Sequence, residues 1–230
     1  MRSEYADIKA VGLDLDGTLV HTYIDYQQLR HWVCGRLLEA GVPAEVFSQP
    51  YGPKLKLDRG LGWLRARGRA EEASALTAAY SAFSQNLELS EDNLGRAAPF
   101  PGTAALLDRL EAAGCPFGVL TQGSRPYAEA VLTRVGLRDR IEVLITRDDY
   151  PPAEAKPAAE ALYHLAERLD VAPAGLLYVG DLELDLLTAR NAGVRFVAVS
   201  SGDISAENWQ KIDRDVLVLP YAAGIADLIF

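Results

Sequence analysis

The feature that most constrains this chain is a pair of aspartates at the end of an apolar segment near the N-terminus. The apolar run Ile8–Leu13 leads into Asp14 and Asp16, which a single leucine separates, and this pattern predicts a buried strand. Because alternate side chains of a strand share a face, the two carboxylates point the same way. Carboxylates that lose hydration together need a cation, a shared proton or a catalytic role. The alternative is a strand that ends in an ordinary Asp-Gly turn at Gly17.

Composition narrows the classes of protein to which the chain can belong. Its 230 residues are 49% hydrophobic, which suits one sizeable core with a smaller insert. A net charge of -9 argues against a nucleic-acid partner, which would need a basic surface. We find no apolar run of membrane-spanning length and no signal peptide, so we expect a cytoplasmic protein without a membrane partner. Cys34 and Cys115 match no metal-ligand spacing and are expected to be buried free thiols.

Strand and helix patterns alternate over residues 97–230, and this order predicts an α/β fold. We expect a Rossmann-like parallel sheet with helices on both faces, of which the first strand is a member. Residues 21–96 show helical spacing and few strand signals, so they read as an all-helical insert. The predicted domains are therefore a core of residues 1–20 and 97–230 and an insert of residues 21–96. The further strands are expected at residues 117–120, 141–145, 176–179, 196–199 and 216–219.

Ligands of open parallel sheets bind beyond the carboxyl ends of the strands, so the residues that follow each strand are candidates for a site. Thr121, Gln122 and Gly123 follow the 117–120 strand and offer a hydroxyl and backbone N–H groups just before a helix. Such a helix start attracts phosphate. The alternative is a plain helix cap at Ser124.

Lys156 stands immediately before Pro157, which we expect to begin a helix. A cation at that position opposes the helix dipole, and a residue that breaks a local rule is a functional candidate. Its role would be to hold a phosphoryl group near the carboxylates. The alternative is a solvated lysine.

Asp181 follows the 176–179 strand, and Asp185 lies in the first turn of the next helix. With Asp14, Asp181 could hold a hard divalent cation, and Mg²⁺ fits a site of few carboxylates. Asp185 has an alternative role as a charge that complements the helix dipole. We find no His/Cys cluster that favours zinc.

With these residues in this order, the chain resembles members of the haloacid dehalogenase superfamily. The family's four motifs occur in order: Asp14 with Asp16 and Thr18, then Thr121, then Lys156-Pro157, then Asp181 with Asp185. The resemblance covers residues 8–20 and 99–230. The helical insert between the first two motifs is similar in type to the small cap of the phosphoglycolate phosphatase and β-phosphoglucomutase branch.

The resemblance implies a role for each matched residue. Asp14 would be the nucleophile that forms an aspartyl-phosphate, and Asp16 would be the acid and base, with its carbonyl on the metal. Thr18 would orient Asp16. Phosphoryl oxygens would be bound by Thr121 with the neighbouring Gln122 and Gly123. Lys156 would stabilise the phosphoryl charge, and the metal ligands would be Asp14, Asp16, Asp181 and Asp185.

These roles lead us to expect a Mg²⁺-dependent phosphatase of a small phosphorylated metabolite, such as phosphoglycolate or a sugar phosphate. The alternative on the same scaffold is a phosphomutase of the β-phosphoglucomutase type, against which Tyr26 counts because the mutases carry a histidine in that segment. A non-catalytic binding module would have no need of Asp16 as an acid. Dehalogenases lack the second aspartate of the first motif, so carbon–halogen cleavage is not expected.

The insert holds a basic cluster in an otherwise acidic chain. It could draw an anionic substrate over the site, or it could be a solvated helix face. His21 lies near the expected hinge and could meet the substrate. The basic cluster consists of Lys54, Lys56, Arg59, Arg65, Arg67 and Arg69.

Overall fold

The computed structural model describes residues 5–49 and 52–230 of the chain. The chain forms two compact units. The core unit combines the residues up to Thr22 with Leu94–Phe230, and the helical insert consists of Tyr23–Asn93. None of the helices within the described ranges combines the length and the apolar character needed to span a membrane. Cys34 and Cys115 are free, as expected, but both are only half-buried.

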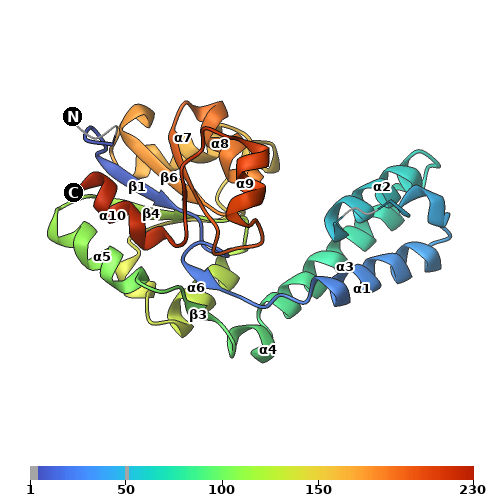
Figure 1. The fold of residues 1–230 in the computed structure, drawn as a ribbon. Coiled ribbons are helices and arrows are strands. Elements are labelled where there is room, and N and C mark those ends of the chain that lie inside the picture. Colours follow the sequence, from blue (N-terminus) through green and yellow to red (C-terminus); the bar gives the residue numbers. More distant parts are fainter. Residues whose placement is uncertain (1–4, 50–51) are drawn as a thin grey trace. The chain divides into compact units, whose positions relative to one another are not determined.

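The core unit contains a six-stranded sheet in which every neighbouring pair of strands is parallel (Figure 1). This confirms the predicted α/β class. Strand β1 lies in the middle, between β4 and β6, so the segment with the two aspartates runs through the centre of the unit. The order is β5 (Val143–Ile145), β4 (Phe117–Leu120), β1 (Ala10–Leu13), β6 (Leu176–Gly180), β7 (Arg195–Val199) and β8 (Val218–Leu219).

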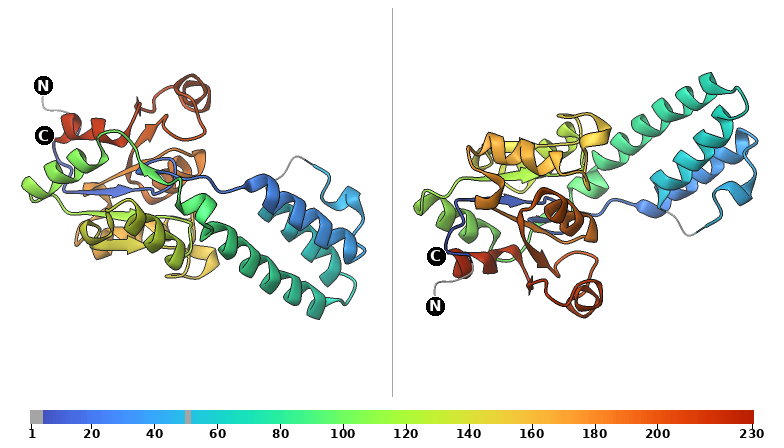
Figure 2. Two further views of the ribbon diagram at one scale, coloured as in Figure 1. Left: turned by 90° about the horizontal axis from the view of Figure 1, so that it is seen from below. Right: turned by 90° about the horizontal axis from the view of Figure 1, so that it is seen from above.

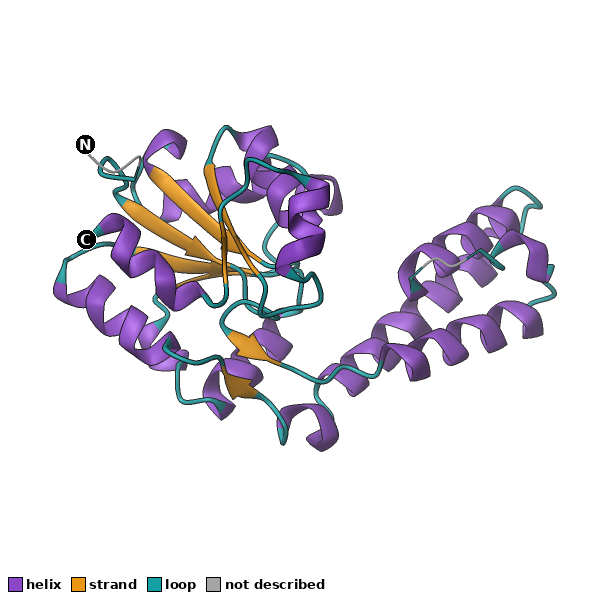
Figure 3. Cartoon of the chain, in the orientation of Figure 1, coloured by secondary structure: helices purple, strands orange, loops and turns teal. Residues whose placement is uncertain are grey.

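Helices cover both faces of this sheet (Figures 2 and 3). Helices α7 and α8 pack side by side against the central strands, and α5 packs with α10. Leu165 of α7 approaches so closely that a Cβ atom at Gly12 would lie 2.5 Å from its Cδ2, so any larger residue there would force the Leu165 side chain to move. The helices are α5 (Thr103–Ala112), α6 (Arg125–Arg134), α7 (Glu160–Arg168), α8 (Glu183–Ala192), α9 (Ala206–Ile212) and α10 (Ala226–Ile229).

One predicted helix start is wrong. Helix α7 begins at Glu160, not at Pro157, because a tight turn in which Ala158 N donates to Ala155 O at 2.8 Å comes first. Lys156 is therefore part of this turn and does not stand at a helix N-terminus. Its charge therefore does not oppose a helix dipole, and its contacts explain why a lysine stands at this position.

The helical insert has a small core of its own. Helix α1 (Tyr26–Glu39) is capped by Asp25, whose carboxylate accepts from Gln28 N at 2.8 Å. It packs against α2 (Pro53–Arg65) and α3 (Ala70–Glu88). The predicted turn-rich segment 44–53 holds one short 3₁₀ helix, Ala44–Val46, and includes two positions, 50 and 51, outside the described residues. The buried apolar residues of this core include Val33, Leu37, Val42, Phe47, Leu57, Leu61 and Leu64.

The two segments of the core unit that flank the insert along the chain pair with each other as a two-stranded antiparallel ribbon. It pairs β2 (Val20–His21) with β3 (Ala98–Pro99). Two hydrogen bonds to Leu19 O, from Phe100 N at 2.9 Å and from Thr103 Oγ1 at 3.2 Å, hold this ribbon beside the start of α5. A short helix, α4 (Glu91–Leu94), precedes β3.

Candidate active site

The carboxyl ends of three neighbouring strands bring the predicted residues together. Asp14 follows β1, Thr121 follows β4, and Asp181 follows β6. The strand register sets this convergence, since Asp14 N donates to Val179 O at 2.9 Å and Thr121 N donates to Ile145 O at 2.9 Å. The edge of a parallel sheet is where ligands of this fold class bind, because loops and helix starts meet there.

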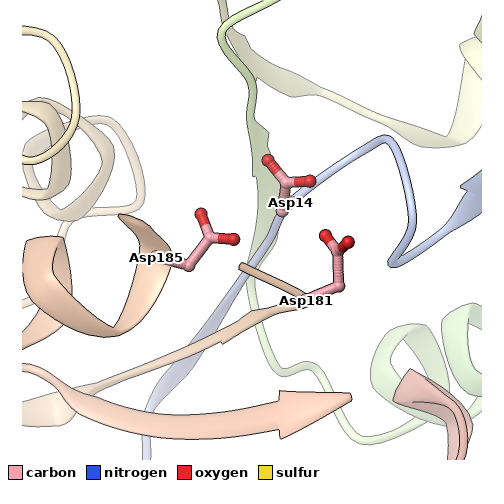
Figure 4. Close-up of side chains that lie close together, drawn as sticks. All are labelled: Asp14, Asp181 and Asp185. Atoms are coloured by element: carbon pink, nitrogen blue, oxygen red, sulfur yellow. The ribbon is translucent and has the colours of Figure 1, made fainter. Parts of the chain in front are cut away.

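Three aspartates form a buried acidic triad at this edge (Figure 4). Asp14, Asp181 and Asp185 are 7%, 4% and 1% exposed, and each offers a carboxylate oxygen within 4.8 Å of the others. Asp181 is enclosed by glycines, because a Cβ atom at Gly17 or Gly202 would overlap its carboxylate. Gly17 also has a φ of +79°, which a side chain at that position would disfavour.

Lys156 supplies the cation that this triad requires. Its Nζ donates to Asp14 Oδ1 at 2.6 Å and to Asp185 Oδ1 at 2.7 Å, and the lysine is 6% exposed. The turn that carries Lys156 is itself held by two side-chain amides: Gln122 Nε2 donates to Lys156 O at 2.9 Å, and Asn191 Nδ2 donates to Pro157 O at 2.8 Å. The lysine is therefore not solvated.

Burial and mutual repulsion shift the pKa values of these groups. Burial raises the pKa of Asp14 well above its usual range, Lys156 opposes this, and Asp185 and Asp181 add to it. Burial, and next the charge of Asp185, raise the pKa of Asp181 to about 7. Burial lowers the pKa of Lys156, but Asp14 and Asp185 outweigh that effect and hold it above its usual range.

The donor set fits a divalent cation. If all three carboxyl groups are ionised, they and the ammonium group of Lys156 leave two negative charges in a buried volume, and a divalent cation would neutralise that excess. The ligand atoms are all oxygens, which hard cations such as Mg²⁺ prefer. The acidic triad could therefore hold an ion of this kind.

Thr18 contacts the acidic triad. Its hydroxyl donates to Asp181 Oδ1 at 3.3 Å, and its predicted role of orienting Asp16 stays a prediction. Asp16 is contacted by two further hydroxyl groups. Its Oδ1 accepts from Thr22 Oγ1 at 2.7 Å and from Tyr127 OH at 2.5 Å. The sequence did not predict either of these contacts. Tyr127 could not be identified from it, because its position has the pattern of a buried residue in a helix.

The loop after β4 has an internal bond that shapes it. Gly123 N donates to the Thr121 hydroxyl oxygen at 2.9 Å, and Thr121 is buried. Because the Gln122 amide nitrogen contacts the turn of Lys156, its visible role is support of that turn, and its predicted contact with phosphate stays a prediction. Ser124 begins α6 as its N-cap, so the predicted cap is present alongside the candidate anion site.

Much of the predicted basic cluster is engaged within the helical insert. Lys56 is buried, and its Nζ donates to Phe47 O and Gln49 O, each at 2.6 Å. Lys54 pairs with Asp58, Arg69 pairs with Glu72, and Arg67 lies 3.8 Å from the centre of the Trp63 ring. These contacts favour a structural role for those residues. In the core unit His21, the other candidate for substrate contact, stacks on Phe100 with ring centres 5.7 Å apart.

Comparisons of the sequence with a family model and with curated relatives agree with one another. A family model for haloacid dehalogenase-like hydrolases matches residues 8–193. A phosphoglycolate phosphatase of Xanthomonas campestris is 35% identical over 215 residues, which cover 91% of each chain. An N-acetylmuramic acid 6-phosphate phosphatase of Pseudomonas putida is 32% identical over 212 residues, which cover 88% of this chain and 89% of the relative.

Solved structures agree in fold. A predicted phosphoglycolate phosphatase of Haemophilus somnus superposes with a TM-score of 0.65 at 20% identity and covers 96% of this chain and 98% of its own. A haloacid dehalogenase hydrolase of Entamoeba histolytica gives a TM-score of 0.67 at 16% identity, with coverages of 96% and 99%. With the parallel sheet and the buried triad, these matches place the chain among enzymes whose named relatives are phosphatases: it belongs to the haloacid dehalogenase-like hydrolases.

Proposed function

We propose that this hydrolase is a Mg²⁺-dependent phosphatase that removes the phosphoryl group of a small phosphorylated metabolite through a covalent aspartyl-phosphate on Asp14. The observation that carries the proposal is the setting of the Asp14 carboxylate. It ends the central strand, lies 2.6 Å from Lys156 Nζ and shares its surroundings with two more buried carboxylates. Such a setting holds an anionic nucleophile ready for an anionic substrate only if cations balance the charge.

In the first step an Asp14 carboxylate oxygen attacks phosphorus. A P–O bond to Asp14 forms while the bond to the leaving oxygen breaks, and Asp16 donates a proton to that oxygen. Lys156 stabilises the charge on the phosphoryl group. The second step releases inorganic phosphate: water attacks phosphorus, Asp16 takes a proton from the water, and the P–O bond to Asp14 breaks. Asp16 thus ends the cycle in the protonation state in which it began.

Bound Mg²⁺ would neutralise phosphoryl oxygens and lower the repulsion between substrate and nucleophile. Asp14 and Asp181 would hold it with the carbonyl of Asp16, and Asp185 would bind it directly or through water. Thr18 then keeps the Asp181 carboxylate in place through its 3.3 Å bond. Lys156 would remain paired with Asp14 and Asp185. Together the lysine and the bound ion would leave the buried site without excess negative charge.

The loop after β4 supplies the phosphoryl-binding groups. Thr121 lies just before the start of α6, where the helix dipole favours an anion. The helical insert, residues 23–93, is proposed to act as the cap that selects the substrate. Two relatives of similar identity are named for phosphoglycolate and for N-acetylmuramic acid 6-phosphate, so we propose a substrate among small phosphomonoesters of organic acids and sugars.

The first test is phosphate release over a panel of such monoesters, with Mg²⁺ and with EDTA. We expect Mg²⁺-dependent release by the wild type and a loss of more than about 10³-fold in Asp14→Asn, since the nucleophile is removed. Asp139→Asn is the matched control, because Asp139 is an exposed aspartate that precedes β5 and so lies at the amino end of that strand, away from the candidate site. Release that survives in Asp14→Asn, or no release from any monoester, contradicts the proposal.

The same panel addresses the phosphomutase alternative. A mutase needs a sugar bisphosphate to phosphorylate its aspartate and returns an isomer of the sugar phosphate, whereas a phosphatase passes the phosphoryl group to water. We expect stoichiometric inorganic phosphate and no isomer by ³¹P NMR. Isomer formation without net phosphate release would support the mutase.

A further inference from the structure

We propose that Tyr127 is a positioning residue that sets the Asp16 carboxyl group for proton transfer. This inference rests on the proposed function, because Asp16 has a proton to transfer only if the chain cleaves phosphate esters. Tyr127 lies on α6, 111 positions along the chain from Asp16, and its hydroxyl donates to Asp16 Oδ1 at 2.5 Å. The phenol ring is buried, with 1% of the residue exposed, so the hydroxyl is delivered from the core and not from the surface.

The start of α6 is built to place this ring. Ser124 caps the helix, and its hydroxyl accepts from Tyr127 N at 3.4 Å, which fixes the backbone at the base of the side chain. Gly123 leaves the space that the ring occupies, because a Cβ atom there would lie 2.6 Å from Tyr127 Cδ1. The start of α6 thus aims the phenol hydroxyl of Tyr127 at Asp16.

Two donors meet on one oxygen of Asp16. Thr22 Oγ1 also donates to Oδ1, at 2.7 Å. With two hydrogen bonds fixing Oδ1, the carboxyl plane is held and the proton that moves is carried by Oδ2. In the first step this proton passes from Oδ2 to the leaving oxygen as its bond to phosphorus breaks. In the second step Oδ2 receives a proton from the attacking water.

The test separates positioning of the acid from a general loss of structure. Tyr127→Phe keeps the ring and removes only the hydroxyl. We compare kcat/KM for the alkyl phosphate of the panel that the wild type hydrolyses fastest with kcat/KM for 4-nitrophenyl phosphate. This parameter covers the steps up to departure of the leaving group. An alkoxide needs the proton of Asp16 to leave, whereas 4-nitrophenolate leaves without it.

We expect Tyr127→Phe to lose about tenfold or more in kcat/KM with the alkyl phosphate, because the lost hydrogen bond strengthens as Asp16 gives up its proton and becomes charged. The loss with 4-nitrophenyl phosphate should stay within about threefold. Thr22→Val should show the same split between substrates. The double variant should lose less than the product of the two single losses, because both bonds hold one oxygen.

Tyr150→Phe is the matched control. Tyr150 is also a buried tyrosine of the core unit, at 7% exposure, and its hydroxyl has no hydrogen-bond partner among the described residues. Removing that hydroxyl should change kcat/KM less than twofold with either substrate. The thermal shift on adding Mg²⁺ should be equal in the wild type and both tyrosine variants, which shows that the acidic triad is intact.

Two results overturn the inference. One is a Tyr127→Phe variant with wild-type kcat/KM on both substrates. The other is an equal loss on both, which would assign Tyr127 a structural role only. A failure of the proposed function itself is recognised separately, because it would appear in the wild type as absent Mg²⁺-dependent phosphate release before any tyrosine variant is compared.

Discussion

Two buried lysines, one in each unit of the molecule, show how the same residue type serves different ends. Lys156 in the core unit and Lys56 in the helical insert are each 6% exposed. Lys156 contacts two carboxylates, Asp14 and Asp185, at 2.6 and 2.7 Å. Lys56 contacts two backbone carbonyls, those of Phe47 and Gln49, each at 2.6 Å.

Carboxylate partners indicate that Lys156 belongs to a reactive site, whereas carbonyl partners indicate that Lys56 has a structural role. Carbonyl oxygens satisfy the hydrogen-bonding needs of Lys56 without adding charge, so its ammonium group simply holds a loop against α2. Lys156 is surrounded by carboxylates whose combined charge, when all are ionised, exceeds its own, so the site takes up either a proton or a further cation. The contacts of Lys156 therefore favour a role in the reaction, whereas those of Lys56 favour a role in the stability of the helical insert.

The largest effect is expected when Lys156 is removed. Lys156→Met leaves the acidic triad without its cation, so kcat/KM for phosphate release should fall about 10³-fold. The free energy of unfolding of the metal-free protein should also fall by roughly 3–5 kcal/mol at pH 7.5, because buried carboxylates lose their partner. Initial rates and urea titrations in EDTA measure both quantities. Activity within tenfold of the wild type would remove the distinction between the two lysines.

The next effect concerns pH. The pKa of Asp181 is raised from 3.8 to about 7 in the folded chain, so between these values the folded state binds a proton that the unfolded state releases. Stability of the metal-free protein should therefore fall as pH rises from about 4 to about 7, by roughly 4 kcal/mol from this group. Urea titrations in EDTA at several pH values measure it. Asp181→Asn should flatten the dependence, and an unchanged slope in that variant would assign the effect elsewhere.

A smaller effect is expected in the insert. Lys56→Met removes two hydrogen bonds to buried carbonyls and should cost roughly 1–3 kcal/mol of stability. Circular dichroism during urea titration follows this loss. The Mg²⁺-induced thermal shift should persist, because the acidic triad belongs to the core unit. Loss of that shift would mean that the two lysines are not independent.

The smallest effect is expected for an exposed member of the basic cluster. Arg65 lies in the last turn of α2 and is exposed, so Arg65→Gln should change stability by less than about 0.5 kcal/mol. Its effect on KM decides between the two predictions for the cluster. An increase of more than about threefold that fades at high salt would favour attraction of the substrate. An unchanged KM would favour a solvated face.

Much of the fold could be predicted because it depends on local pattern. Short apolar runs alternating with helical periods indicate a parallel sheet, and the six parallel strands confirm it. The acidic triad could be predicted for the same reason: Asp14 and Asp181 follow apolar strands, and the carboxyl ends of parallel strands share one edge. The start of α7 could not, because a tight turn at residues 155–158 overrides the preference of Pro157 for a first helical turn.

Partners between distant segments also lay outside the reach of sequence reasoning. Thr18 stands two positions from Asp16, yet its hydroxyl bonds Asp181, 163 positions away. Tyr127 has the pattern of a core residue, and only the packing of α6 shows that its hydroxyl ends on Asp16. A hydroxyl bonds whatever acceptor the packed chain places within reach, and sequence spacing carries no information on that.

The sequence by itself determined which chemical groups stand at the strand ends, and so which chemistry is available: carboxylates, a hydroxyl and a lysine at the edge of a parallel sheet. The tertiary structure alone decided which group each of them contacts. Strand identity follows from a periodicity of two residues that any short segment reveals. Hydrogen-bond partners follow from distances of about 3 Å between atoms that can be more than a hundred residues apart, as in the bond from Tyr127 to Asp16. Only the packed helices and strands set such distances.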